Sequence, residues 1–255
     1  MRRSKPTAVA LCIAMSLLCA AAAQAEKKAE KKAEKVSVLI VTGFDVGSHK
    51  WQEASSETAA ILSKSGRFDV KIAESLDVLA TSALKDYDVL VLNYGFWKQG
   101  GPSDEGKAGL LNYVKGGKGV VALHFACSSF QEWDEYHELI GRWWKKGKGG
   151  HGPFGKFTVN VADKEHPIAK GIKDFETSDE LYAKLSGDAK IHVLATAFSE
   201  WSGKVEPIIF SKPYGKGRVV QNVLGHGPKA RANESYQKLI CRCTEWAATG
   251  SVTVD

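Results

Sequence analysis

Three continuous apolar stretches constrain the fold of this chain more than any other feature of its sequence. They cover residues 36–43, 88–95 and 119–124, and valine, leucine and isoleucine dominate them. Strands that are apolar along their whole length are buried on both faces, as in a parallel sheet that helices cover. These stretches alternate with segments of helical spacing. The alternation predicts an α/β fold with a mostly parallel sheet between two helical layers.

The other predicted elements are more regular in the first half of the chain than in the second. Helices are expected at 51–65, 103–115, 132–144 and 234–248. Further strands are expected at 68–73, 157–161, 191–197, 206–211 and 217–223, with a glycine-rich loop at 145–155. Ligands of parallel sheets bind at the carboxyl ends of the strands. Polar residues just after a strand are therefore the first candidates for a functional site.

The first 25 residues have the three parts of a cleavable secretory signal. Basic residues precede an apolar stretch at 8–22, and residues 23–25 form a small-x-small cleavage site. The expected mature chain begins at Glu26 with a charged spacer of lysine, glutamate and alanine at 26–35. We therefore expect an exported protein, periplasmic or extracellular, with no membrane span after removal of the signal.

Charge and cysteine content narrow the classes of function. The chain carries a net charge of +6, but from Val36 onward 27 basic residues face 26 acidic ones. A nearly neutral domain is not expected to bind nucleic acid. Outside the signal the cysteines are Cys127, Cys241 and Cys243, and this odd number does not predict a disulfide framework. The fold must then depend on its apolar core.

Four histidines lie at predicted strand ends or in loops, where the side chains of a shared pocket would meet. His49 follows the first strand, His124 ends a buried strand, His151 lies in the glycine-rich loop, and His226 follows the last strand. Imidazole exchanges protons near neutral pH and also binds metals. The set predicts one pocket, and ordinary surface or capping histidines are the alternative. The set could in principle bind a divalent metal, and this stays open, but a metal is not indicated because no histidine has the partner spacing of common zinc sites.

The segment Asp179-Glu180-Leu181-Tyr182 is the second candidate. Its adjacent acids could supply one carboxylate to the pocket and one to solvent, and a turn with two solvated acids is the alternative. Cys127, three residues past His124, would be a nucleophile only if a histidine activated it. The residues around Cys127 lack the glycines of a nucleophile elbow, which favours a bystander thiol.

Aromatic residues and glycines bear on the ligand. Trp51 is one of several tryptophans whose flat faces suit stacking on sugar rings, although core packing would explain them as well. The loop after the first strand lacks the glycine spacing that cradles phosphates, so no nucleotide cofactor is expected.

Together these motifs resemble the ThuA-like (trehalose utilization) family. The pattern consists of His-x-Trp, Leu-His, His-Pro-x-x-x-Gly, Asp-Glu-Leu-Tyr, Gly-Lys-Gly-Arg and Gly-His, within residues 39–51, 117–130, 136–151, 166–182 and 206–226. The resemblance implies one domain at 36–250, followed by a short tail at 251–255. It also implies a flavodoxin-like three-layer sandwich, similar to class I glutamine amidotransferases. The amidotransferase cysteine elbow is missing, so glutamine hydrolysis is not expected.

The resemblance further implies a link to sugar metabolism, through oxidised (3-keto) glycosides. We expect a sugar-active lyase, isomerase or hydrolase with His124, His226 and Glu180 as its catalytic residues. The residues expected to bind the sugar are His49, Trp51, His151, Asp179 and Tyr182. Two other hypotheses remain: a carbohydrate-binding module of the cell envelope without catalysis, and a hydrolase that uses Cys127 with a histidine.

Overall fold

The computed structural model describes residues 35–44, 47–98 and 100–255. The predicted signal at 1–25 and all but the last residue of the spacer lie outside the described residues. Residues 35–255 form one compact unit. Within the described residues, we find no helix that is both long enough and apolar enough to cross a membrane.

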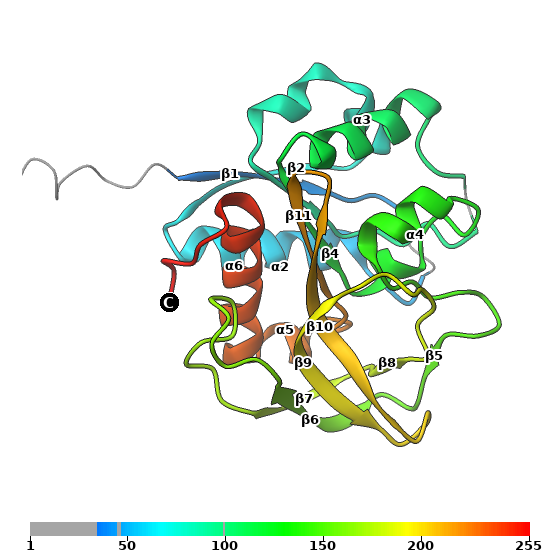
Figure 1. The fold of residues 1–255 in the computed structure, drawn as a ribbon, viewed down its shortest axis with the longest axis vertical. Helices are drawn as coiled ribbons and strands as arrows, with labels where there is room; N and C mark the ends of the chain where they lie inside the picture. Colours follow the sequence, from blue (N-terminus) through cyan, green and yellow to red (C-terminus); the bar gives the residue numbers. More distant parts are fainter. Residues whose placement is uncertain (1–34, 45–46, 99) are drawn as a thin grey trace, which may run out of the picture. The chain divides into compact units, whose positions relative to one another are not determined.

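The core of this unit is a sheet of nine strands in the order β2-β1-β3-β4-β11-β10-β9-β6-β7 (Figure 1). Five of them form the parallel half of the sheet: β1 (Val36–Val41), β2 (Phe68–Ala73), β3 (Val89–Leu92), β4 (Gly119–Leu123) and β11 (Gly217–Asn222). All side chains of β3 and β4 are buried, which confirms the prediction from their continuous apolar sequence.

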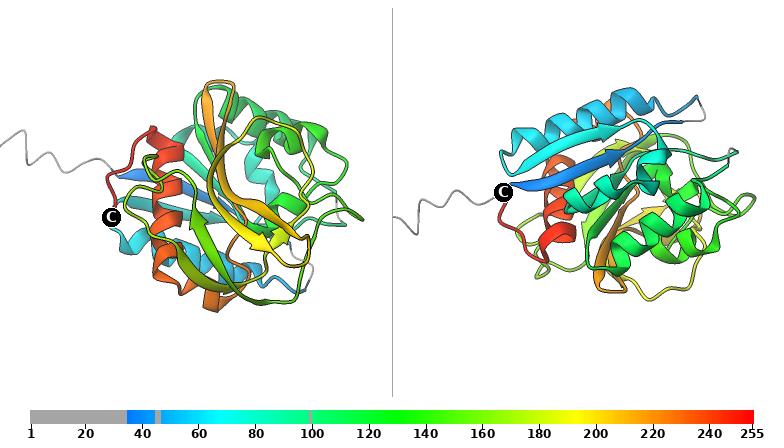
Figure 2. Two further views of the ribbon diagram at one scale, coloured as in Figure 1. Left: turned by 60° about the horizontal axis from the view of Figure 1, so that its bottom comes forward. Right: turned by 90° about the horizontal axis from the view of Figure 1, so that it is seen from above.

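Helices cover both faces of the parallel strands. On one side α2 (Trp51–Lys64) and α6 (Glu234–Thr249) pack against each other, and on the other lie α3 (Asp104–Lys115) and α4 (Asp134–Ile140) (Figures 1 and 2). This arrangement confirms the predicted α/β three-layer sandwich of the flavodoxin and class I glutamine amidotransferase type.

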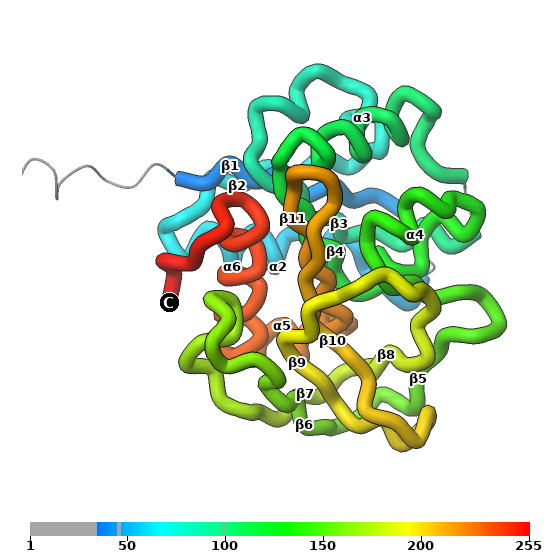
Figure 3. The backbone as a smooth tube through the Cα atoms, in the orientation of Figure 1, coloured from blue at the N-terminus to red at the C-terminus, as the bar shows by residue number. Residues whose placement is uncertain are grey.

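The second half of the sheet is antiparallel. It consists of β10 (Lys204–Tyr214), β9 (His192–Ser199), β6 (Gly155–Val161) and β7 (Phe175–Asp179). A small second sheet pairs β5 (Gly150–His151) with β8 (Tyr182–Ala183), so His151 lies opposite Tyr182 (Figure 3). Part of the predicted glycine-rich loop is therefore a strand that faces the Asp-Glu-Leu-Tyr segment.

Several predicted boundaries were wrong. The helix expected at 132–144 is α4 and ends at Ile140, because Gly141 adopts φ 85° and stops it. Two short 3-10 helices, η1 (Leu76–Ala80) and η2 (Ser82–Asp86), occupy a stretch with no predicted element. A third, η3 (His124–Ser128), begins where β4 ends, and α5 (Pro228–Arg231) follows β11.

Candidate functional site

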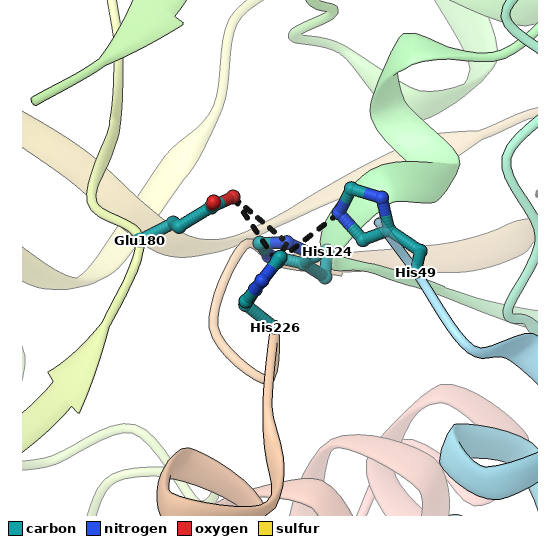
Figure 4. Close-up of side chains that lie close together, drawn as sticks. All are labelled: His49, His124, Glu180 and His226. Carbon is teal, nitrogen blue, oxygen red and sulfur yellow. Dashed lines mark hydrogen bonds and ion pairs between the residues drawn. The ribbon is translucent and has the colours of Figure 1, made fainter. Parts of the chain in front are cut away.

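Three histidines reach one point from the carboxyl ends of parallel strands. His49 follows β1, His124 follows β4, and His226 follows β11. The Nδ1 atom of His226 lies 3.2 Å from Nε2 of His49 and 3.3 Å from Nε2 of His124 (Figure 4). The predicted convergence of these strand ends therefore exists in the structure, although β3 lies between β1 and β4.

Glu180 brings a carboxylate to the same point from the antiparallel half of the molecule, between β7 and β8. Its Oε2 atom lies 3.1 Å from Nδ1 of His226 and 3.8 Å from Nε2 of His124 (Figure 4). Its Oε1 atom lies 3.6 Å from Nε2 of His151. We call His49, His124, Glu180 and His226 the four-residue cluster.

The orientation and protonation of His124 are fixed by its surroundings. Its Nδ1 donates to the carbonyl oxygen of Val223 at 2.7 Å, because a carbonyl oxygen can only accept. The Nε2 atom therefore carries a lone pair in the neutral ring, and it accepts from the Tyr182 hydroxyl at 2.8 Å. Burial, with His49 nearby, lowers the pKa of His124 well below its usual value. His124 is thus a neutral lone-pair donor at neutral pH.

The backbone of His124 is strained as well. Its φ of 40° is unusual for a residue with a side chain, and only two other non-glycine residues in the described part of the chain have positive φ. Strain of this kind concentrates at functional sites, because the surrounding structure must hold it in place.

The two acids of the Asp-Glu-Leu-Tyr segment have different roles. Burial works to raise the pKa of Glu180, but the hydrogen bond and charge of His226, together with the charges of His151 and His49, outweigh it. The pKa of Glu180 therefore lies below its usual value. Burial raises the pKa of Asp179 to about 6. Asp179 is fully buried and the Glu180 side chain is only 14% exposed, so the expectation that one acid faces solvent was wrong.

Asp179 holds the loop that carries His226. Its carboxylate accepts from the backbone N–H of Gly225 at 2.7 Å and from that of His226 at 3.0 Å. The buried Arg231 donates to the carbonyl oxygens of the same two residues, both at 3.1 Å. Both the N–H and the C=O groups of the loop are therefore fixed by side chains. We interpret Asp179 as a positioning residue, because its oxygens are occupied by backbone donors.

The remaining predicted site residues surround the cluster. Tyr182 is buried against His124, and His151 lies at the rim with a half-buried side chain that donates from Nδ1 to the carbonyl oxygen of Gly152. Trp51 begins α2 and, with His49, lines a cavity of about 30 Å³ beside the cluster. That volume suits a water molecule or an ion and is too small for a sugar ring.

Cys127 does not belong to this site. Its side chain is fully buried, and burial raises the pKa of its thiol to about 12. A thiol with this pKa stays protonated at neutral pH and is a poor nucleophile. The hypothesis of a hydrolase that uses Cys127 therefore loses its reactive group.

Two contributors to the site carried no usable signal in the sequence. The ring of Phe125 stacks on that of His49, with centroids 4.1 Å apart and planes inclined by 13°. Arg231 lies 178 residues from its partner Glu53 and 174 residues from its partner Glu57 in the sequence. Position next to His124 was the only hint for Phe125, and nothing in the sequence indicated that Arg231 is buried.

The cluster also has the composition of a metal site. One ligand atom from each of its four residues lies within 4.8 Å of the others. Imidazole nitrogen and carboxylate oxygen suit divalent transition ions. The arrangement is therefore compatible with two kinds of chemistry, proton transfer and metal binding.

The fold and the cluster define a flavodoxin-like α/β protein whose polar site lies at the carboxyl ends of its parallel strands. The sequence model of the ThuA family, described as trehalose utilisation, matches residues 37–247. The chain therefore belongs to the ThuA family.

Solved structures agree with this assignment. A ThuA-like protein from Parabacteroides merdae is similar with a TM-score of 0.78 and 30% identity, over 87% of this chain and 93% of that one. A ThuA-like protein from Bacteroides uniformis is similar with a TM-score of 0.69 and 16% identity, over 86% and 95% of the two chains. At 16% identity, the similarity to the Bacteroides uniformis protein shows the fold alone. Among curated proteins none matches.

Proposed function

We propose that this chain acts on a sugar derivative with a keto group and removes the proton from the carbon next to that group. The observation that carries the proposal is the four-residue cluster at the strand ends of a trehalose-utilisation protein. A carbonyl acidifies the neighbouring C–H, so one well-placed base can start the reaction without a nucleophile. This chemistry agrees with the unreactive state of Cys127.

Glu180 is the proposed base. Its lowered pKa keeps it ionised at neutral pH, and its two oxygens point to His226 and His151. The C–H bond breaks, the proton passes to the carboxylate, and the electron pair moves to the carbonyl oxygen as an enolate. For isomerisation, the proton of the hydroxyl on that carbon moves to the enolate oxygen, a new carbonyl forms at that carbon, and Glu180 returns its proton to the former carbonyl carbon. For elimination, the enolate electrons re-form the carbonyl, and the glycosidic oxygen leaves with its bonding electron pair, takes up the proton from Glu180 and departs as an alcohol.

His226 and His151 are the proposed partners of Glu180. The sequence predicts His124 as a catalytic residue beside His226 and Glu180. His124 suits this role less well, because its Nδ1–H is held by Val223 and its Nε2 already faces Tyr182. We therefore keep His226 in the proton-transfer group, add His151, and leave His124 as a lone-pair donor in the floor of the site.

Turnover of 3-keto-trehalose by the wild type, Glu180→Gln and His192→Ala tests the proposal. Loss of a general base lowers turnover by about 10²–10⁴-fold, so Glu180→Gln should fall by at least a hundredfold. His192 pairs with Asp163 on the surface and its removal should leave the rate unchanged. Equal rates for wild type and Glu180→Gln would refute the assignment.

A carbohydrate-binding module without catalysis is the second candidate. The small cavity at the cluster favours it, since a sugar ring would have to bind at the outer rim instead. Two exposed aromatic rings lie near this rim. The ring of Phe154 lies 6.1 Å from that of His226, and the ring of Trp201 lies beside Gly150 of β5. Binding of 3-keto-trehalose with no product after prolonged incubation would favour this candidate.

Export of the chain is also a proposal, and it rests on the sequence of residues 1–25. The intact mass of the protein isolated from a bacterial host tests it. A mature chain that begins at Glu26 and is found outside the cytoplasm is the expected result.

A further inference from the structure

We infer that the four-residue cluster binds a divalent transition-metal ion, with His49 Nε2, His124 Nε2, His226 Nδ1 and a Glu180 carboxylate oxygen as its ligands. This inference goes beyond the proposed function, because the site can bind metal whether or not the chain acts on a sugar.

The spacing of the four atoms is the first argument. Metal–ligand bonds of about 2.0–2.1 Å in a tetrahedral zinc site place neighbouring ligand atoms about 3.3 Å apart. From His226 Nδ1 the distances are 3.2 Å to His49, 3.3 Å to His124 and 3.1 Å to Glu180. The His124–Glu180 distance is 3.8 Å. All four ligand atoms lie within 4.8 Å of one another, so small side-chain movements would close the site around such an ion.

The second argument is that two acceptor atoms face one another inside the cluster. His124 Nε2 holds a lone pair because its proton is on Nδ1, and the Glu180 carboxylate only accepts. These two acceptors lie 3.8 Å apart, and the Nδ1 atom of His226 lies 3.1 Å from Glu180 Oε2 and 3.3 Å from His124 Nε2. A cation at this centre would attract both lone pairs at once.

Groups behind the ligands hold them in orientation, as in known metal sites. The carbonyl oxygen of Val223 fixes the ring and tautomer of His124, and Ser48 contacts Nδ1 of His49 at 3.1 Å. Stacking on Phe125 restricts the plane of the His49 ring. The adjoining cavity of about 30 Å³ leaves room for one further small ligand, such as water.

The donor set selects the class of ion. Three imidazoles and one carboxylate suit Zn²⁺ and neighbouring first-row ions, whereas Mg²⁺ and Ca²⁺ prefer oxygen ligands. With Glu180 Oε2 as a ligand, the ion would leave Oε1, which faces His151, as the proposed base, and its charge would stabilise a developing enolate oxygen.

Calorimetric titration of the chelator-treated chain with ZnCl₂ tests the inference. We expect one Zn²⁺ per chain and an affinity that falls by more than about tenfold in His226→Gln and in Glu180→Gln. The matched control is His192→Ala, which removes a surface histidine and should keep the wild-type affinity. Circular dichroism of each variant checks that it folds.

A second readout does not depend on affinity. Co²⁺ in place of Zn²⁺ should give the intense visible d–d bands of a four-coordinate site in the wild type, and these should disappear in His226→Gln. The inference is refuted if the wild type binds no Zn²⁺, or if binding survives in His226→Gln and Glu180→Gln. Zn²⁺ binding without turnover of 3-keto-trehalose would support the metal site and refute the proposed activity. Turnover of 3-keto-trehalose without metal binding would support the proposed activity and refute the metal site.

Discussion

Replacement of Arg231 by methionine should loosen the His226 loop and destabilise the domain. The Arg231 side chain is only 4% exposed and donates to the carbonyl oxygens of Gly225 and His226. Each buried carbonyl left without a partner costs about 1–3 kcal/mol, so for the two carbonyls we expect a loss of about 2–6 kcal/mol. The partners Glu53 and Glu57 are 38% and 39% exposed, so water takes over their solvation and they add little.

Thermal unfolding measures this loss. For a domain of this size 1 kcal/mol corresponds to about 2–4 °C in Tm, so Arg231→Met should lower Tm by about 4–24 °C. Glu57→Gln is the matched control, because it weakens the ion pair and leaves both carbonyl contacts intact. It should lower Tm by less than about 3 °C, which corresponds to an exposed pair worth up to about 1 kcal/mol.

Amide hydrogen exchange separates a local role from a general one. Asp179 holds the N–H groups of Gly225 and His226. Relative to the wild type, the exchange of these two amides in Arg231→Met should speed up more than the exchange of the β4 amides does. A Tm change below about 2 °C would contradict the assigned role of the carbonyl contacts. So would a loss in Glu57→Gln that equals the loss in Arg231→Met.

Three further predictions concern packing and protonation. Gly95→Ala would place a Cβ atom in steric overlap with the Phe125 ring, so we expect a loss of about 1–3 kcal/mol in unfolding experiments and weaker metal binding at His49. Burial tends to raise the pKa of Glu245, but hydrogen bonds from Thr253 and Arg67 lower it below its usual value. Its contribution is therefore complete above a pH of about 4.3, the unfolded pKa, and disappears as the pH falls through the folded pKa. Glu245→Gln should thus have a lower Tm than the wild type at pH 7, and the difference should shrink in acid. Cys127→Ser should keep the wild-type turnover per folded chain, and a large loss would return Cys127 to the mechanism.

Much of the parallel half of the sheet could be predicted because its signals are local. The apolar strands at 36–43 and 119–124 must be buried on both faces, and their carboxyl ends must meet at one edge. His49, His124 and His226 were found for that reason. Helix ends set by a positive φ, as at Gly141, were missed because the sequence allowed the helix to continue.

The contacts between the two halves of the sheet could not be predicted. The sequence marked Asp179 and Glu180 as candidates but gave them the wrong environment, because their burial depends on how the β7–β8 connection packs against the loop after β11. The pairing of β5 with β8 places His151 near Glu180, and no periodicity in the glycine-rich stretch indicates a strand there. Long-range pairing of this kind is decided by tertiary packing, which a local pattern does not contain.

The site depends on both halves of the sheet. The parallel half supplies the three histidines of the cluster, and the connection after β7 in the antiparallel half supplies Glu180, with Asp179 as the clamp on the His226 loop. Neither half alone has a complete set of metal ligands or an oriented base. An ion bound by both would link them, and at a free concentration of 100 times Kd it would add about 2.7 kcal/mol to the stability of the native state. Saturating Zn²⁺ should therefore raise Tm in the wild type and fail to do so in His226→Gln. An equal rise in both proteins would show that the stabilising ion binds elsewhere.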